Sequence, residues 1–202
     1  MTKRHIHSIW SKIAFLSPWY LLAMAIISGL ICVMALRQNN LNMVKLRNQV
    51  FAADKANGDT ETALRNLREY IYSHMNTNLD SGNGIKPPIQ LKYSYERLVD
   101  AEKKRVDAAN AKIYNDAQKY CEQFISHKVF GGASISCVQN YASTHGLKQQ
   151  PIPDSLYKFD FVSPAWTPDL AGWSMVVTIL LALLFIIRLG LEKWVKHDLA
   201  NS

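Results

Sequence analysis

Two uncharged, strongly apolar runs stand out in the pattern of hydrophobic and polar positions along the chain. The first has no charged residue between Lys12 and Arg37, and it includes the 20 residues 17–36. A helix of about 20 residues extends about 30 Å, the thickness of the hydrocarbon core of a bilayer. Trp19 and Tyr20 near its start are typical of a membrane interface. The run therefore predicts a transmembrane helix over residues 17–36.

A cleavable signal peptide is the alternative interpretation of this first run. Lys3 and Arg4 would form its basic start, and residues 33–35 (Val-Met-Ala) resemble a cleavage site. The apolar core of a signal peptide has only about 7–15 residues, which is shorter than this run. We therefore expect an anchor that is not cleaved.

The second apolar run has no charged residue over 170–187, a length of 18 residues. This length reaches the usual threshold for a spanning helix. Trp166 and Trp173 stand at one end of the run and Trp194 at the other. A buried core helix is the alternative, but the run lacks the polar positions that recur at helical spacing in such helices. We expect a second transmembrane helix over residues 170–187.

Two spans place both chain ends on one side of the membrane and residues 37–169 on the other. The two terminal segments that flank the spans contain six basic residues: Lys3, Arg4, Lys12, Arg188, Lys193 and Lys196. Because such residues are enriched in cytoplasmic segments, we expect the tails 1–16 and 188–202 to be cytoplasmic. Three basic residues just after the first span weigh against this: Arg37, Lys45 and Arg47. Long segments cross membranes largely regardless of charge, so we expect an extracytoplasmic domain in a protein of the cell membrane.

Helical periodicity dominates the segment between the spans. The first helix is expected to continue to about residue 56, where Asn57 and Gly58 favour a helix stop. Leucine and isoleucine at a spacing of three to four residues then predict an amphipathic helix over 60–75. A polar, glycine-containing loop separates this helix from the Pro87-Pro88 pair, which is expected to open a third helix.

The third helical pattern covers residues 89–127 and has apolar side chains seven residues apart: Val99, Val106, Ile113 and Tyr120. This spacing predicts a coiled-coil-like seam suited to antiparallel packing, although Glu102 and Lys103 interrupt it. Gly131-Gly132 favour a turn, and a short fourth helix is expected over 134–144. The predicted fold class is all-α, with two transmembrane helices flanking a mainly helical, bundle-like domain.

Four prolines change the pattern between residues 148 and 168: Pro151, Pro153, Pro164 and Pro168. Residues 156–162 partly alternate between apolar and polar, which is compatible with one short strand. The sequence offers no clear partner for such a strand. We expect instead an extended segment that packs its aromatic side chains along the helices.

Composition and charge exclude several classes of protein. The chain is 49% hydrophobic, 10% aromatic and 19% charged, which excludes disordered, collagen-like and disulfide-dense chains. Residues 37–167 hold 17 Lys/Arg and 13 Asp/Glu, a net charge of +4 that is spread over helical faces. We therefore expect no nucleic-acid partner, whereas weak attraction to anionic lipid headgroups or cell-wall polymers is compatible with this charge.

Two of the three cysteines are candidates for a disulfide. Cys121 and Cys137 are about equally distant from the Gly131-Gly132 turn, so an antiparallel helical hairpin would place them opposite each other. A bond would pin the short helix to the long one, and an extracytoplasmic location would favour it. The alternative is two buried free thiols. Cys32 lies within the first span, where we expect a small apolar filler.

Other reactive side chains do not combine into a recognisable site. His74, His127 and His145 lack the spacing of known metal-binding motifs. Ser155 and Lys158 match the SxxK string of serine acyl enzymes, but their proline-flanked segment is expected to be extended and the companion motifs are missing. We predict no catalytic residue, no metal, no cofactor and no enzymatic activity.

The layout of two spans around a helical segment resembles that of small two-span bacterial envelope proteins with a helical middle domain. Residues 44–50 (Val-Lys-Leu-Arg-Asn-Gln-Val) are also similar to the segment after the anchor in LemA-type proteins. That similarity covers a short stretch, and the rest of the LemA pattern is missing. It implies no role for any residue of this chain.

These features favour a membrane-anchored envelope protein that acts by protein–protein interaction or as a scaffold. Its partners are expected to be the lipid bilayer and either another protein or a second copy of the chain. The alternative is an extracytoplasmic, ligand-sensing helical bundle. Such a sensor would signal through a membrane partner, because the 15 residues after Ile187 are too few for an output module.

Overall fold

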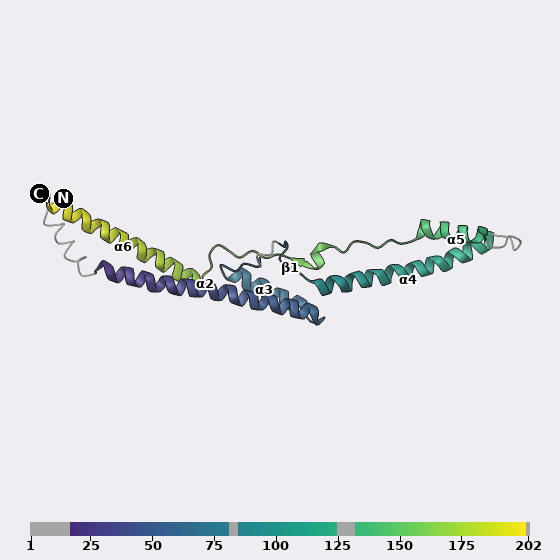
Figure 1. Cartoon of the computed structure of the whole chain (residues 1–202), viewed down its shortest axis with the longest axis horizontal. Coiled ribbons are helices and arrows are strands. Elements are labelled where there is room, and N and C mark those ends of the chain that lie inside the picture. Colours follow the sequence, from purple (N-terminus) through teal and green to yellow (C-terminus); the bar gives the residue numbers. More distant parts are fainter. Residues whose placement is uncertain (1–16, 81–84, 125–131, 201–202) are drawn as a thin grey trace. The chain divides into compact units, whose positions relative to one another are not determined.

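The computed structural model describes residues 17–80, 85–124 and 132–200 of the chain. Within these residues the fold is mostly helical, which confirms the coarse prediction from periodicity. The helices are α2 (Pro18–Lys55), α3 (Thr60–Ser73), α4 (Lys92–Phe124), α5 (Gly132–His145) and α6 (Leu170–Ala200) (Figure 1). A short strand, β1 (Ile89–Gln90), precedes α4. A 3-10 turn, η1 (Asp154–Leu156), and a second short strand, β2 (Lys158–Phe159), lie between α5 and α6.

The chain divides into two compact units. Unit 1 comprises Met1–Val50, Glu61–Gly84 and Phe161–Ser202, and unit 2 comprises Phe51–Thr60 and Ile85–Asp160. The segment 37–169, which the sequence predicts as one middle domain, therefore contributes to both units.

Helix α2 is uninterrupted from the predicted first span to Lys55. It ends where the sequence predicts, because Asn57 adopts a positive φ of 52° and the backbone N–H of Gly58 donates to the carbonyl of Ala53 at 2.9 Å. Asparagine tolerates this left-handed conformation better than most residues do. The chain then turns into α3, which covers most of the predicted helix 60–75.

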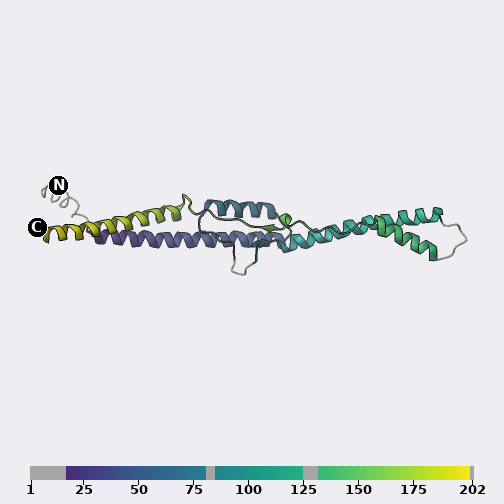
Figure 2. The same cartoon turned by 90° about the horizontal axis from the view of Figure 1, so that it is seen from above.

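Three helices build unit 1. Helices α3 and α6 each run alongside α2 in both views (Figures 1 and 2). Four apolar side chains of α2 and α3 are fully buried: Met43, Val50, Leu67 and Ile71. A hydrophobic cluster joins Ala35 of α2, Met75 just after α3 and Ala171 of α6.

Two helices of unit 1 are long and apolar enough to cross a membrane: Pro18–Lys55 and Leu170–His197. In the first helix, only 22% of the most apolar 18-residue stretch is buried inside the structure. In the second helix, the corresponding share is 17%. The core helix of a soluble protein would be mostly buried. Large aliphatic side chains such as Met34 and Ile186 are instead more than half exposed on these helices.

Unit 2 contains a helical hairpin, α4 and α5, and a two-stranded antiparallel ladder. In the ladder Ile89 pairs with Phe159 and Gln90 with Lys158, and the N–H of Leu91 donates to the carbonyl of Tyr157 at 2.8 Å. The predictions that a helix starts at Ile89 and that the later strand has no partner were therefore wrong. The proline pair at 87–88 explains the difference, because proline favours an extended chain before it and supplies no N–H.

The seam of α4 differs from the predicted heptads. Val106 is buried as predicted, but Ile113 is only half-buried and Tyr120 is 48% exposed, while Ala117 and Cys121 are buried. The buried positions Val106 and Ala117 are 11 residues apart, about three helical turns, whereas a heptad seam would continue at Ile113 and Tyr120. Helix α5 spans Gly132–His145 and thus contains the predicted helix 134–144. Residues 125–131, with His127 and the first glycine of the predicted turn, lie outside the described residues.

Candidate functional site

The structure brings the predicted pair Cys121 and Cys137 together at disulfide-bonding distance, with their Cα atoms 6.1 Å apart. The cysteines stand on the facing sides of α4 and α5, and the side chain of Cys121 is 1% exposed. A bond at this position ties the first half of the 14-residue helix α5 to α4, and a helix of this length is too short to be stable alone in water. Cys32, in α2, is buried, and its Sγ lies 3.7 Å from the carbonyl oxygen of Ala171.

Three aromatic rings continue along the hairpin from the cysteine pair, and we call them the aromatic strip: Tyr120, Tyr141 and His145. The ring centroids of Tyr120 and Tyr141 are 5.3 Å apart, and those of Tyr141 and His145 are 4.2 Å apart in a stacked arrangement. Tyr141 is half-buried, whereas Tyr120 and His145 are exposed. The strip is therefore a supported aromatic surface that is open to solvent.

The remaining predicted candidates lie in separate surroundings. His74 stacks on Tyr70 with the ring centroids 4.0 Å apart, and His127 lies outside the described residues. Among residues 17–80, 85–124 and 132–200, no group of three or more His, Cys, Asp or Glu side chains could hold a metal ion. The Nζ of Lys158 is 2.9 Å from Oδ1 of Asp154, and this hydrogen bond raises the pKa of Lys158. A lysine that acts as a general base needs a lowered pKa, so the arrangement does not match the SxxK chemistry.

Sequence reasoning missed a buried carboxylate in unit 2. Asp54, in the last turn of α2, is 2% exposed and accepts hydrogen bonds from the backbone N–H groups of Tyr93 and Ser94 at 3.0 and 2.7 Å. These N–H groups belong to the first turn of α4, where no helical partner exists for them. Arg97 donates to both the carbonyl and the carboxylate of Asp54, at 3.0 and 3.1 Å. Asp54 therefore caps α4 from another part of the chain.

A second missed cluster joins the three segments of unit 1, and we call it the polar junction. The Nδ2 of Asn39 donates to the carbonyl of Met75 at 3.3 Å and to Oδ2 of Asp169 at 2.8 Å. The other carboxylate oxygen of Asp169 accepts from the N–H of Gly172 at 2.8 Å, and the N–H of Met75 donates to the Thr167 hydroxyl. Burial raises the pKa of Asp169, but the hydrogen bonds from Gly172 and Asn39 outweigh it and hold this pKa below its ordinary value.

Small and hydroxyl side chains line the contact between the two apolar helices. Ser28 Oγ donates to the carbonyl of Ser174 at 3.2 Å, and Oγ1 of Thr178 lies 3.0 Å from Ser28 Oγ. A Cβ on Gly29 would stand 3.7 Å from the Thr178 methyl group, so the backbones approach closely here. Small residues and interhelical hydrogen bonds are typical of helix pairs that associate within lipid.

The chain matches no protein-family model, and it has no significant match among curated protein sequences or solved structures.

Proposed function

We propose that this chain is a two-span membrane protein whose α4–α5 hairpin lies outside the cytoplasm and binds another protein chain. The exposed apolar surface of α2 and α6 supports the membrane part of the proposal. Most of the apolar surface of these two helices is not buried inside the protein. Lipid tails would cover this surface, as they cover that of other spanning helices.

The aromatic strip is the observation that carries the interaction part. Packing of α5 on α4 accounts for the half-buried Tyr141, but it does not require Tyr120 to be 48% exposed or His145 to be exposed. Tyrosine is enriched in the energetically important centres of protein interfaces, because its ring offers a large contact area at a small cost in side-chain entropy. The disulfide-linked hairpin supports such a surface in one fixed geometry.

Orientation is tested by labelling whole cells with a membrane-impermeant thiol reagent. Lys104 is exposed on α4, so Lys104→Cys should react in intact cells. A cysteine appended after Ser202 should react only after lysis, because the basic tails favour the cytoplasm. The reverse pattern would contradict the orientation.

Interaction is tested by placing a photo-crosslinking amino acid at Tyr120, with the same amino acid at Lys103 as the matched control. Both positions are exposed on α4, but only Tyr120 belongs to the aromatic strip. We expect a discrete crosslinked product from position 120 and none from position 103. The mass of the product separates a second copy of the chain from a different protein. Equal products, or none from either position, would contradict the proposal.

A further inference from the structure

A cavity of about 620 Å³ lies in unit 1 between the start of α2 and the carboxyl-terminal part of α6. Its size falls within the range of about 300–1,000 Å³ that is usual for small-molecule sites. One part of its wall is apolar and consists of Pro18, Trp19, Phe185 and Leu189. The other part carries the charged side chains Glu192, Lys193 and Lys196. The cavity is therefore amphipathic.

The charged part of the wall has a positive balance. Glu192 is neutralised by Lys196, whose Nζ lies 2.9 Å from Oε1 of Glu192. Lys193 forms no ion pair with any residue that the structure describes, and it adds one net positive charge. Helix α2 also begins here and has no acidic residue in its first turn, so the positive end of its dipole is not compensated locally.

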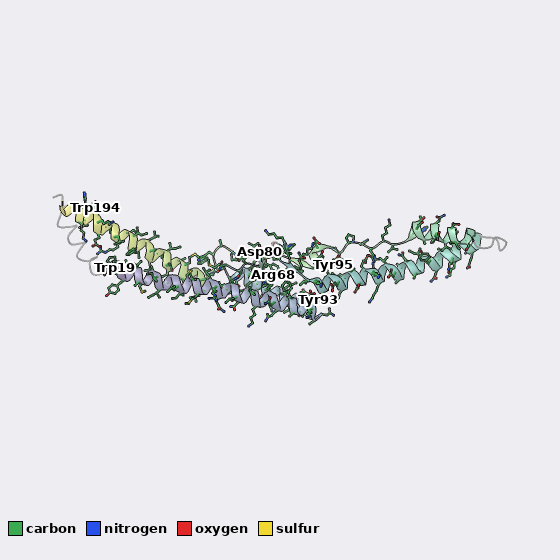
Figure 3. The ribbon with its side chains drawn as sticks, in the orientation of Figure 1. Trp19, Arg68, Asp80, Tyr93, Tyr95 and Trp194 are labelled. Carbon is green, nitrogen blue, oxygen red and sulfur yellow. A yellow bond between two sulfur atoms is a disulfide. The ribbon has the colours of Figure 1, made fainter. Side chains whose placement is uncertain are left out.

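The position of the cavity favours a lipid over a soluble anion. Trp19 and Trp194 lie at the same end of the two apolar helices (Figure 3), and tryptophan is enriched at the headgroup level of membranes. The apolar wall suits the glycerol and upper acyl region of a lipid, and the lysines suit its phosphate. Residues 1–16 carry three basic and no acidic residues, so charge repulsion disfavours the chain's own amino-terminal segment as the occupant.

We propose that this cavity binds the phosphate headgroup and upper acyl region of one anionic phospholipid. The inference rests on the proposed membrane insertion of α2 and α6. Basic pockets between spanning helices are known to recognise anionic headgroups, and each lysine near the surface contributes about 1 kcal/mol, or about fivefold in affinity. Lys193 supplies the charge recognition, and Phe185 and Leu189 supply the apolar contact.

Native mass spectrometry of the full chain in mild detergent tests the proposal, with equimolar phosphatidylglycerol and phosphatidylcholine as the probes. We expect one phosphatidylglycerol to be retained in preference to phosphatidylcholine. Lys193→Gln should lower that retention about fivefold. Leu189→Trp, which fills the cavity without changing its charge, should lower the retention of both lipids. Lys104→Gln removes an exposed charge from unit 2 and should behave like the unchanged chain.

Equal retention of the two lipids, or retention that neither cavity variant alters, would overturn the proposal. Displacement of the lipid by millimolar inorganic phosphate would also overturn it, because the site would then be an ordinary anion site. Alkaline extraction of cell membranes separates this failure from failure of the proposed function. A chain that is extracted refutes membrane insertion, whereas a chain that stays in the membrane without selecting phosphatidylglycerol refutes only the lipid site.

Discussion

The side-chain amide of Asn39 donates a hydrogen bond to the carboxylate of Asp169 at 2.8 Å across 130 positions of sequence. The same nitrogen donates to the carbonyl of Met75, and the Asn39 side chain is buried. Asn39→Ala would leave both acceptors without this donor, and an unsatisfied buried polar group costs about 1–3 kcal/mol. We expect a corresponding loss of unfolding free energy, measured by thermal unfolding of the full chain in detergent.

Asn48 provides the control for this prediction because it lies on the same helix, is exposed and is the same residue type. Asn48→Ala should change the unfolding free energy by less than about 0.5 kcal/mol. If both variants unfolded at the same temperature, the polar junction would not contribute to stability.

Two glycines of α6 form a second matched pair. A Cβ on Gly172 would overlap the carbonyl oxygen of Thr167, whereas a Cβ on Gly190 would meet nothing within 4 Å. Gly172→Ala should therefore destabilise the chain by about 1–3 kcal/mol through overpacking against backbone. Gly190→Ala should leave the unfolding temperature unchanged or slightly higher, because alanine favours helices. Equal effects of the two substitutions in thermal unfolding would refute the close approach at Gly172.

The cysteine pair of unit 2 predicts a redox-dependent stability. Cys121 and Cys137 are separated by 16 positions, and closing a loop of this length stabilises a fold by about 3 kcal/mol. The double variant Cys121→Ser, Cys137→Ser should lose about that amount, and reductant should lower the stability of the unchanged chain toward that of the variant. Mass spectrometry of protein purified with a thiol-blocking reagent checks the bond directly. Alkylation of both cysteines would contradict it.

Glu102 of α4 predicts an acid-sensitive contact within unit 2. Its carboxylate accepts hydrogen bonds from Arg105 at 2.7 and 2.9 Å and from the backbone N–H of Gln150 at 3.0 Å. These bonds, led by that from Arg105, lower the pKa of Glu102 from 4.5 to about 2. The folded state therefore favours the ionised carboxylate. Its stabilising effect is fully present above pH 4.5 and is lost as the pH falls toward 2.

The measurement for Glu102 is the urea midpoint of the unchanged chain minus that of Glu102→Gln as a function of pH. We expect a positive difference at pH 6 that shrinks between pH 4.5 and 2. Glu122→Gln is the control, because Glu122 is exposed on the same helix. A difference for Glu102 that did not change with pH would contradict the linkage between the ionisation of this carboxylate and folding.

Local signals in the sequence predicted most helix boundaries. The end of α2 follows from Asn57 and Gly58, because few other residues adopt the left-handed conformation found there. The facing cysteines follow from their distances to a glycine turn, which is again a local argument. The seam of α4 was less predictable. A spacing of seven and a spacing of 11 residues both include Val106, but the first continues to Ile113 and the second to Ala117, which is the buried residue.

Long-range polar contacts could not be predicted from the same signals. Asp54 sits in a helical pattern as an ordinary charged position, and its partners Tyr93 and Ser94 lie 39 and 40 residues further along the chain. Asn39 is likewise one of several asparagines and glutamines after the first apolar run. The pairing of such groups depends on how the helices are arranged, which periodicity does not encode. The partner strand β1 escaped prediction because its two residues, Ile89 and Gln90, are too few to show alternation.

The cap that Asp54 provides has a consequence for any attempt to produce the hairpin as a soluble piece. A recombinant fragment that starts in the loop after α3 would contain all of α4 and α5 yet lack the acceptor for the amides of Tyr93 and Ser94. Arg97 would also lose its counter-charge. The smallest autonomous fragment therefore needs the last turn of α2, supplied in cis or as an added peptide. A protease that cuts between residues 55 and 92 would leave this cap intact, along with the contacts of α2 with Asp169 and α6.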